Sequence, residues 1–232
     1  MIAEAIDKIL VLSNPELYKF GDRQYATKQL VPVKNPRPEP LEISTLTSLV
    51  GYLQDNKDAL NLEHLIVHVA GVANVVLMSR LQSPWLTRDS YLQVKTEFKQ
   101  FPFGQYLDVE SFIIALQSQF VQDEMTAVLL RMVGNLKDEN VGLFGDDGTS
   151  QQVTVKTGIS TVKNVPVPNP IVLAPYRTFR EIDQPASRFV FRMKNGPVCA
   201  LFEADGGAWK NEAVLRVKAY LQEKSPGVTV IA

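Results

Sequence analysis

The spacing of apolar residues changes near residue 145, and this change restricts the possible folds more than any other feature of the sequence. Before it, VESFIIALQSQF (109–120) and EMTAVLLRMVGNLK (124–137) have the apolar periodicity of amphipathic helices. Asp108 and Asp123 precede these segments and are their expected N-caps. After the glycine-rich segment GLFGDDG (142–148), apolar and polar residues alternate, as in strands with one buried face. Helical and strand-rich stretches that are separate in sequence favour an α+β fold.

The part after this change is predicted to be a β-meander, then a helix and a final strand. Asn195-Gly196 indicates a hairpin with a type I′ turn, because both central residues of that turn have positive φ. Residues 211–223 have helical apolar spacing, and Ser225-Pro226-Gly227 ends the helix. Strands are expected at 151–157, 159–165, 171–176, 187–193 and 198–204, with the last one at 228–232. We therefore expect an antiparallel or mixed sheet covered by helices.

The part before Asp108 has its own pattern of helices and strands. Residues 1–12 have helical spacing, whereas the prolines of VPVKNPRPEP (31–40) exclude a helix and favour an extended segment. Ser44 is the predicted N-cap of the next helix. Strands are expected at 63–69, 74–81 and 91–98.

These patterns divide the chain into four consecutive parts. They are an N-terminal helix (1–20), a proline-rich arm or linker (21–40), an α/β part (41–140) and a β-rich α+β part (141–232). A length of 232 residues suits one large domain, so the last two parts are compatible with one continuous domain.

Composition and charge argue against several classes of protein. Apolar residues make up 45% and charged residues 21%, as in a globular protein rather than a disordered or fibrous one. With a net charge of −1, the chain does not have the excess of positive charge that a histone-like or polybasic membrane protein carries. Glu4, Asp7 and Lys8 stand where a signal peptide requires apolar residues, and no apolar run is long enough to span a membrane. We expect a cytoplasmic protein without membrane association.

The motifs of common catalytic and cofactor sites are absent. His64 and His68 are four residues apart in a segment of strand character, with no further ligand nearby to complete a metal site. Cys199 is the single cysteine, which excludes an intramolecular disulfide and predicts a buried apolar role. No glycine-rich phosphate loop or dinucleotide-binding turn occurs, and no cofactor is expected.

The segment FEADGGAWK (202–210) has the most unusual local chemistry. On a strand, Glu203 and Asp205 point to the same face, which is a spacing that a Mg²⁺ site could use. Gly206-Gly207 permits a sharp turn into a helix whose first amide groups could bind an anion. The alternative interpretation is structural, with Asp205 capping the helix.

Four arginines lie in a window of 16 residues just before this segment, and aromatic residues lie near them. Arg188 and Arg192 are four apart on a predicted strand and therefore share a face. Guanidinium groups can grip phosphate and aromatic rings can stack on a base, although an ordinary solvated sheet face also fits the pattern. The candidate ligand-binding residues are Arg177, Arg180, Arg188, Arg192, Tyr176, Gly206, Gly207, Trp209 and Lys210.

The run APYRTFREIDQPASRFVFRMKNGPVCALFEADGGAWKNEAV (174–214) resembles an uncharacterised family of bacteriophage and prophage proteins that is defined only as a domain of unknown function. The resemblance is clearest over residues 165–232 and centres on CALFEADGGAW (199–209). It implies a phage or prophage origin and a cytoplasmic location in the infected bacterium. It transfers no active-site residue to this chain.

Three hypotheses about function follow. We favour a non-enzymatic binding protein that sequesters a small anionic, nucleotide-type ligand such as a signal of host defence. The second is an accessory protein that binds single-stranded nucleic acid in phage replication or recombination, for which phosphate contacts would be needed. The third is a Mg²⁺-dependent enzyme that uses Glu203 and Asp205. A symmetric homo-oligomer is expected on general grounds.

Overall fold

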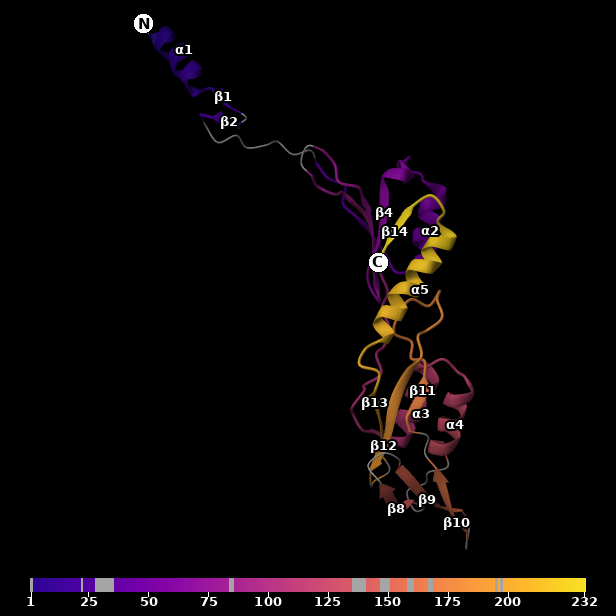
Figure 1. Cartoon of the computed structure of the whole chain (residues 1–232). Coiled ribbons are helices and arrows are strands. Elements are labelled where there is room, and N and C mark those ends of the chain that lie inside the picture. The colour runs from indigo at the N-terminus through magenta and orange to yellow at the C-terminus, as the bar shows by residue number, and fades with distance from the viewer. Residues whose placement is uncertain are drawn as a thin grey trace. The chain divides into compact units, whose positions relative to one another are not determined.

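The structure is a computed structural model that describes residues 2–21, 23–27, 36–83, 86–134, 141–146, 151–157, 161–166, 169–194, 196 and 198–232. The chain divides into two compact units, Met1–Arg37 and Pro38–Ala232. Figure 1 shows the helices and strands of both. The larger unit holds all the buried residues of the described part and therefore contains the core.

The N-terminal unit consists of one helix and one hairpin. Helix α1 (Ile2–Ser13) confirms the helix expected at the start of the chain. Strands β1 (Leu17–Phe20) and β2 (Arg23–Ala26) pair in antiparallel fashion. Strand β2 lies within the range interpreted as an arm or linker, while residues 28–35 of that range lie outside the described part.

A mixed five-stranded sheet forms the first layer of the larger unit, in the order β14-β4-β5-β6-β3. β14 runs parallel to β4 and β3 parallel to β6, whereas β4, β5 and β6 are antiparallel neighbours. Alternate residues of β4, β5 and β6 are buried, so one face of the sheet carries the core. The strands are β3 (Leu41–Ile43), β4 (Leu65–Gly71), β5 (Asn74–Ser79), β6 (Ser90–Lys95) and β14 (Thr229–Ile231).

Helices α2 (Leu46–Asp55) and α5 (Trp209–Lys224) pack against this sheet and against each other. Their buried leucines and valines join the sheet residues in one apolar cluster. The N-cap of α2 is Thr45, whose hydroxyl accepts a hydrogen bond from the Ser48 amide at 3.1 Å. The prediction of Ser44 as N-cap is therefore wrong by one residue, because the threonine has the extended backbone that a cap requires.

A second sheet is antiparallel throughout, in the order β11-β12-β13-β7. Helices α3 (Val109–Gln119) and α4 (Glu124–Gly134) contribute to its apolar cluster, which is rich in phenylalanine. Asp108 and Asp123 cap these helices as predicted, accepting from Ser111 and Thr126 amides at 2.9 and 2.8 Å. The strands are β7 (Leu107–Asp108), β11 (Ile171–Leu173), β12 (Ser187–Lys194) and β13 (Val198–Glu203).

Strands β12 and β13 form the hairpin expected around Asn195-Gly196. Lys194 pairs with Val198, so three residues connect the strands rather than the two of a type I′ turn. Gly196 has a φ of +87°, which a residue with a side chain adopts only at a cost, whereas Asn195 lies outside the described part. A further antiparallel sheet contains β8 (Val141–Asp146), β9 (Gln151–Thr157) and β10 (Thr161–Pro166).

The chain passes from the second sheet back to the first through its C-terminal segment. After β13, helix α5 contacts β4, and β14 adds a parallel strand beside β4. The first apolar cluster therefore contains residues from both sides of position 140, and Pro38–Ala232 forms one unit. The architecture is α+β, with the meander, helix and final strand that the sequence predicted.

Replacement of Leu221 by alanine tests the role of α5 in this arrangement. The side chain is fully buried in the first cluster, so Leu221→Ala should lower the free energy of unfolding by about 2–5 kcal/mol. Leu215 lies on the same helix with 62% of its surface exposed, and Leu215→Ala should change stability by less than about 0.5 kcal/mol. Urea denaturation measures both values. Equal losses would contradict the packing of α5.

Candidate functional site

Arg177, the first arginine of the predicted window, is buried and has internal partners. It lies in the connection from β11 to β12, with only 4% of its side chain exposed. Its guanidinium donates to Glu203 at 2.9 Å and to the Ser187 hydroxyl, and lies 3.8 Å from the centre of the Trp209 ring. Burial lowers the pKa of Arg177 to about 10, although Glu203 and Asp205 oppose this shift. The arginine remains a cation at neutral pH.

Asp205 uses its carboxylate to hold the start of α5. It accepts hydrogen bonds from Ser187 at 2.5 Å and from the Gly207 amide at 3.0 Å. Burial acts to raise the pKa of Asp205, but these hydrogen bonds, the Trp209 amide and the Arg177 charge outweigh it and lower the pKa. The amides that the sequence offered to an anion are thus bonded to Asp205, which favours the structural interpretation of this turn.

Glycine permits this turn, because its backbone lies in the left-handed region. Gly206 and Gly207 have φ of +62° and +82°, which residues with side chains rarely adopt. The charges of Glu203, at the end of β13, and of Asp205, after it, both act on the Arg177 guanidinium. Both carboxylates have protein partners, Glu203 the Arg177 guanidinium and Asp205 the Ser187 hydroxyl and the Gly207 amide. In the described part of the chain, no three histidine, cysteine or acidic side chains are grouped so that they could hold a metal ion.

The remaining arginines of the window do not join Arg177. Arg180 stacks on Tyr176, with its guanidinium 3.6 Å from the ring centre. Arg188 and Arg192 share the outer face of β12, as predicted, whereas Arg177 contacts the inner face through Ser187. Lys210 is exposed near Trp209, with its ammonium group 6.0 Å from the ring centre. The structure therefore brings the predicted residues together in pairs and not around one ligand.

One cavity of about 430 Å³ retains part of the predicted site, where β12 begins, β13 ends and α5 begins. Arg188 and Trp209 both line it, and Arg188 has no side-chain partner among the described residues. The two acidic residues that line this cavity have protein partners. Asp205 accepts from Ser187 and Gly207, and Glu212 forms an ion pair with Arg216 at 2.5 Å. The lining residues are Val172, Ala186, Ser187, Arg188, Ala204, Asp205, Ala208, Trp209 and Glu212.

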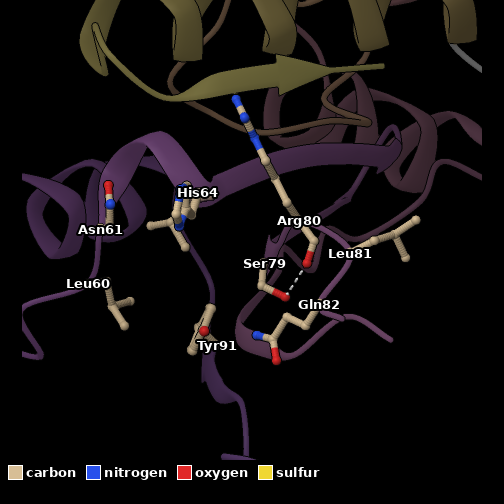
Figure 2. Close-up of a pocket in the computed structure, with 9 residues that line it drawn as sticks. Leu60, Asn61, His64, Ser79, Arg80, Leu81, Gln82 and Tyr91 are labelled. Atoms are coloured by element: carbon tan, nitrogen blue, oxygen red, sulfur yellow. Dashed lines mark hydrogen bonds between the residues drawn. The ribbon is translucent and has the colours of Figure 1, made fainter. Parts of the chain in front are cut away.

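A second cavity of about 420 Å³ lies where β4 begins and β5 ends, and Figure 2 shows the residues that line it. The pairing of Leu65 with Ser79 places the segments 60–64 and 80–82 side by side at this edge of the sheet. The 3₁₀ helix Leu62–His64 forms part of one wall. The lining residues are Leu60, Asn61, His64, Leu65, Ser79, Arg80, Leu81, Gln82 and Tyr91.

Internal hydrogen bonds hold the wall formed by Ser79 and Gln82. The Ser79 hydroxyl donates to the Arg80 carbonyl at 2.8 Å and accepts from the Asp89 amide at 2.9 Å. The Gln82 amide nitrogen donates to the Asp89 carboxylate at 2.8 Å. The Arg80 amide donates to the His64 carbonyl at 2.8 Å, which joins the two walls. These hydrogen bonds hold the side chains of Ser79 and Gln82 in position.

Other groups around the cavity are open to a ligand. Among the described residues, the Arg80 guanidinium and the His64 ring have no hydrogen-bond or ionic partner, and neither has the side-chain nitrogen of Asn61. The side-chain carbonyl oxygen of Gln82 likewise has no partner in the described part of the chain. Arg80 is one of the lining residues, and in Figure 2 its side chain extends away from Gln82 and Tyr91.

Tyr91 provides an aromatic surface in the same cavity. Burial raises the pKa of its hydroxyl, and the charge of Asp89 acts in the same direction. The phenol is therefore neutral at physiological pH and able to donate or accept a hydrogen bond. None of the residues that line this cavity is acidic, but the Asp89 carboxylate lies directly behind Gln82 and its charge acts on Tyr91.

Sequence reasoning considered His64 only as a metal ligand and did not single out Arg80, Asn61, Gln82 or Tyr91. The available signal was the group of polar residues directly before and after two apolar strands, in NLEH (61–64) and SRLQ (79–82). Antiparallel neighbours bring such ends to one edge of a sheet. The pattern alone does not show that the strands are neighbours, which is why the site was missed.

Comparison with known proteins gave no match to a protein-family model, to a curated protein or to a solved structure. The resemblance to the phage and prophage family therefore stays an expectation from the sequence. Among the described residues, no helix is both long and apolar enough to cross a membrane.

The role of the Arg177 ion pair can be tested by comparison with Arg188, which is exposed. Arg177→Met removes the partner of Glu203 and the cation on Trp209, so the free energy of unfolding should fall by about 2–4 kcal/mol. Arg188→Met makes the same change on the outer face and should cost less than about 0.5 kcal/mol. Unfolding in urea, followed by circular dichroism, gives both free energies of unfolding. If Arg188→Met lowered the free energy of unfolding as much as Arg177→Met, the stabilising role of the Arg177 ion pair would be contradicted.

The lowered pKa of Asp205 predicts how stability depends on pH. Because its folded pKa lies below the unfolded value of about 3.8, its contribution is present above that pH and is lost as the pH falls below it. Asp205→Asn should therefore be less stable than the wild type at neutral pH, with the difference shrinking in acid. Unfolding titrations of both proteins across this range measure the difference. A gap that stays constant down to the lowest pH would show that the charge of Asp205 is not involved.

Proposed function

We propose that this protein is a non-enzymatic binding protein for a small, anionic, nucleotide-type ligand, and that the cavity of Figure 2 holds the ligand. The observation that carries the proposal is the presence of an unpaired guanidinium, an aromatic ring and open amide groups around one cavity. Its volume of about 420 Å³ falls within the range of about 300–1,000 Å³ that small-molecule sites occupy.

One part of the cavity lining fits a planar heterocycle. Tyr91 supplies a ring, and Leu60 and Leu65 supply apolar surface. The nitrogen of Asn61 is a donor and the carbonyl oxygen of Gln82 is an acceptor, and a nucleobase edge has complementary groups. Apolar walls with a few directed polar groups are typical of sites that bind such ligands.

The edge of the cavity fits an anionic group. Arg80 carries a charge that no described residue neutralises, and a guanidinium binds phosphate through two parallel hydrogen bonds. The absence of acidic residues from this lining distinguishes it from the cavity of Arg188, where Asp205 and Glu212 are present. For this reason we place the ligand beside Arg80.

The two other hypotheses receive less support. For single-stranded nucleic acid, a continuous basic surface would be needed, and Arg177 is buried in an ion pair. For a Mg²⁺-dependent enzyme, Glu203 and Asp205 would have to be directed at an open site, whereas both are bonded within the protein. A phage origin, a role against host defence, a location in the infected cell and a homo-oligomeric state remain parts of the proposal.

Calorimetry tests the proposal directly. Wild-type protein is titrated with adenosine, guanosine, cytidine and uridine 5′-monophosphates and with cyclic dinucleotides, and the purified protein is denatured to identify any retained ligand by mass spectrometry. At least one nucleotide should bind. Arg80→Ala should then weaken that binding by about tenfold or more, because a charge-assisted hydrogen bond is lost.

Arg188→Ala is the matched control, because it removes an unpaired guanidinium from the other cavity. If only Arg188→Ala weakens binding, the ligand lies in the cavity beside Trp209 and the placement is wrong. If no nucleotide binds and none is released on denaturation, the proposed function fails. Conversion of any bound nucleotide to a product would contradict the non-enzymatic role.

A further inference from the structure

His64 and Arg80 are directly opposite each other where β4 begins and β5 ends. The ladder pairs Leu65 with Ser79, and the Arg80 amide donates to the His64 carbonyl at 2.8 Å, so the pairing extends by one residue. Side chains of opposite residues lie on the same face, with Cβ atoms about 5 Å apart. Both residues line the cavity of Figure 2, and both are exposed. One small group can therefore contact both side chains.

The side-chain donors of these two residues are unused within the described part of the chain. A guanidinium has only N–H donors, and an imidazole always carries at least one. No described acidic side chain forms an ion pair or a hydrogen bond with either residue. The Asp89 carboxylate accepts from the Gln82 amide nitrogen instead. An anion beside His64 and Arg80 would therefore receive hydrogen bonds from both strands.

This pair of donors distinguishes a terminal phosphate from a phosphodiester. A terminal phosphate has three non-bridging oxygens and a charge of about −1.5 to −2 at neutral pH. The guanidinium of Arg80 can bind two of these oxygens through parallel hydrogen bonds, and the third is then available to His64. A phosphodiester has only two such oxygens, so the guanidinium uses both and the imidazole is left without an acceptor.

The rest of the lining has contacts for one base. Apart from the His64 imidazole its only ring is that of Tyr91, and its only guanidinium is that of Arg80. In Figure 2 the His64 ring and the Arg80 side chain lie away from Tyr91 and Gln82. A nucleotide has the same separation, because the ribose stands between its base and its phosphate. A cyclic dinucleotide would need a second ring and a second cation, which this lining does not contain.

We propose that the ligand is a mononucleotide with a terminal phosphate, and that His64 and Arg80 together bind this phosphate. The inference rests on the proposed function, because it names the class of nucleotide for the same cavity. His64 is the residue that selects a phosphate monoester over a diester, whereas Arg80 contributes to the binding of both.

Calorimetry with two ligands that share a base tests the inference on the full chain. Adenosine 5′-monophosphate has a terminal phosphate, and adenosine 3′,5′-cyclic monophosphate has a diester on the same base and ribose. The guanosine, cytidine and uridine pairs are titrated in the same way. For the base that binds, the 5′-monophosphate should bind about tenfold more tightly, because one charge-assisted hydrogen bond forms only with the monoester.

Variants of the two histidines assign this preference. His64→Ala should weaken the 5′-monophosphate about tenfold and leave the cyclic nucleotide unchanged, because only the monoester loses a hydrogen bond. His64→Gln keeps an N–H donor and should retain part of the preference. His68→Gln is the matched control, because His68 does not line the cavity and both affinities should stay the same. Arg80→Ala should weaken both nucleotides.

The outcomes separate this inference from the proposed function. If no nucleotide of any kind binds, the proposed function fails and the inference fails with it. If the cyclic mononucleotide or a cyclic dinucleotide binds as tightly as the 5′-monophosphate, the cavity is a nucleotide site but the inference is wrong. A preference for the 5′-monophosphate that is unchanged in His64→Ala would also overturn it, since His64 would then not bind the phosphate.

Discussion

The buried guanidinium of Arg177 links the parts of the larger unit. It bonds to Ser187 at the start of β12 and to Glu203 at the end of β13, and it stacks on Trp209 at the start of α5. The same connection supplies Phe179 to the first apolar cluster, which belongs to the other sheet. One buried cation therefore contacts β12, β13 and α5 where the chain passes between the two cores, and loss of a partner would leave its charge buried without compensation.

This requirement explains why the arginine-rich window does not form an open binding site. The Arg177 guanidinium bonds to Glu203 and Ser187 and covers an indole ring, and only 4% of the side chain is exposed to solvent or to a ligand. Asp205 in turn bonds to the amides at the start of α5, which would otherwise be available to an anion. Residues with the chemistry of phosphate recognition therefore stabilise the fold, whereas Arg80 and Arg188 each line a cavity without a side-chain partner among the described residues.

Sequence rules predicted correctly those features that depend on residues a few positions apart. Asp108 and Asp123 were identified as caps because an N-cap bonds to amides two or three residues away. The same-face placement of Arg188 and Arg192 followed from the period of a strand. The helix cap at 44 was misplaced by one residue, since serine and threonine are nearly equivalent caps and the neighbouring backbone decides between them.

The sequence by itself determined the α+β class, the helices and the order of meander, helix and strand, because periodicity, capping residues and turn residues act over a few positions. It did not predict the short strands β1, β2, β3 and β7, and it took the glycine-rich segment of β8 as a boundary. Only the tertiary structure decided that β14 joins β4, that Arg177 is buried, and that Asn61, Arg80 and Tyr91 line one cavity. These facts depend on which strands become neighbours. Strand pairing joins residues that are far apart in the chain, and no local pattern specifies it.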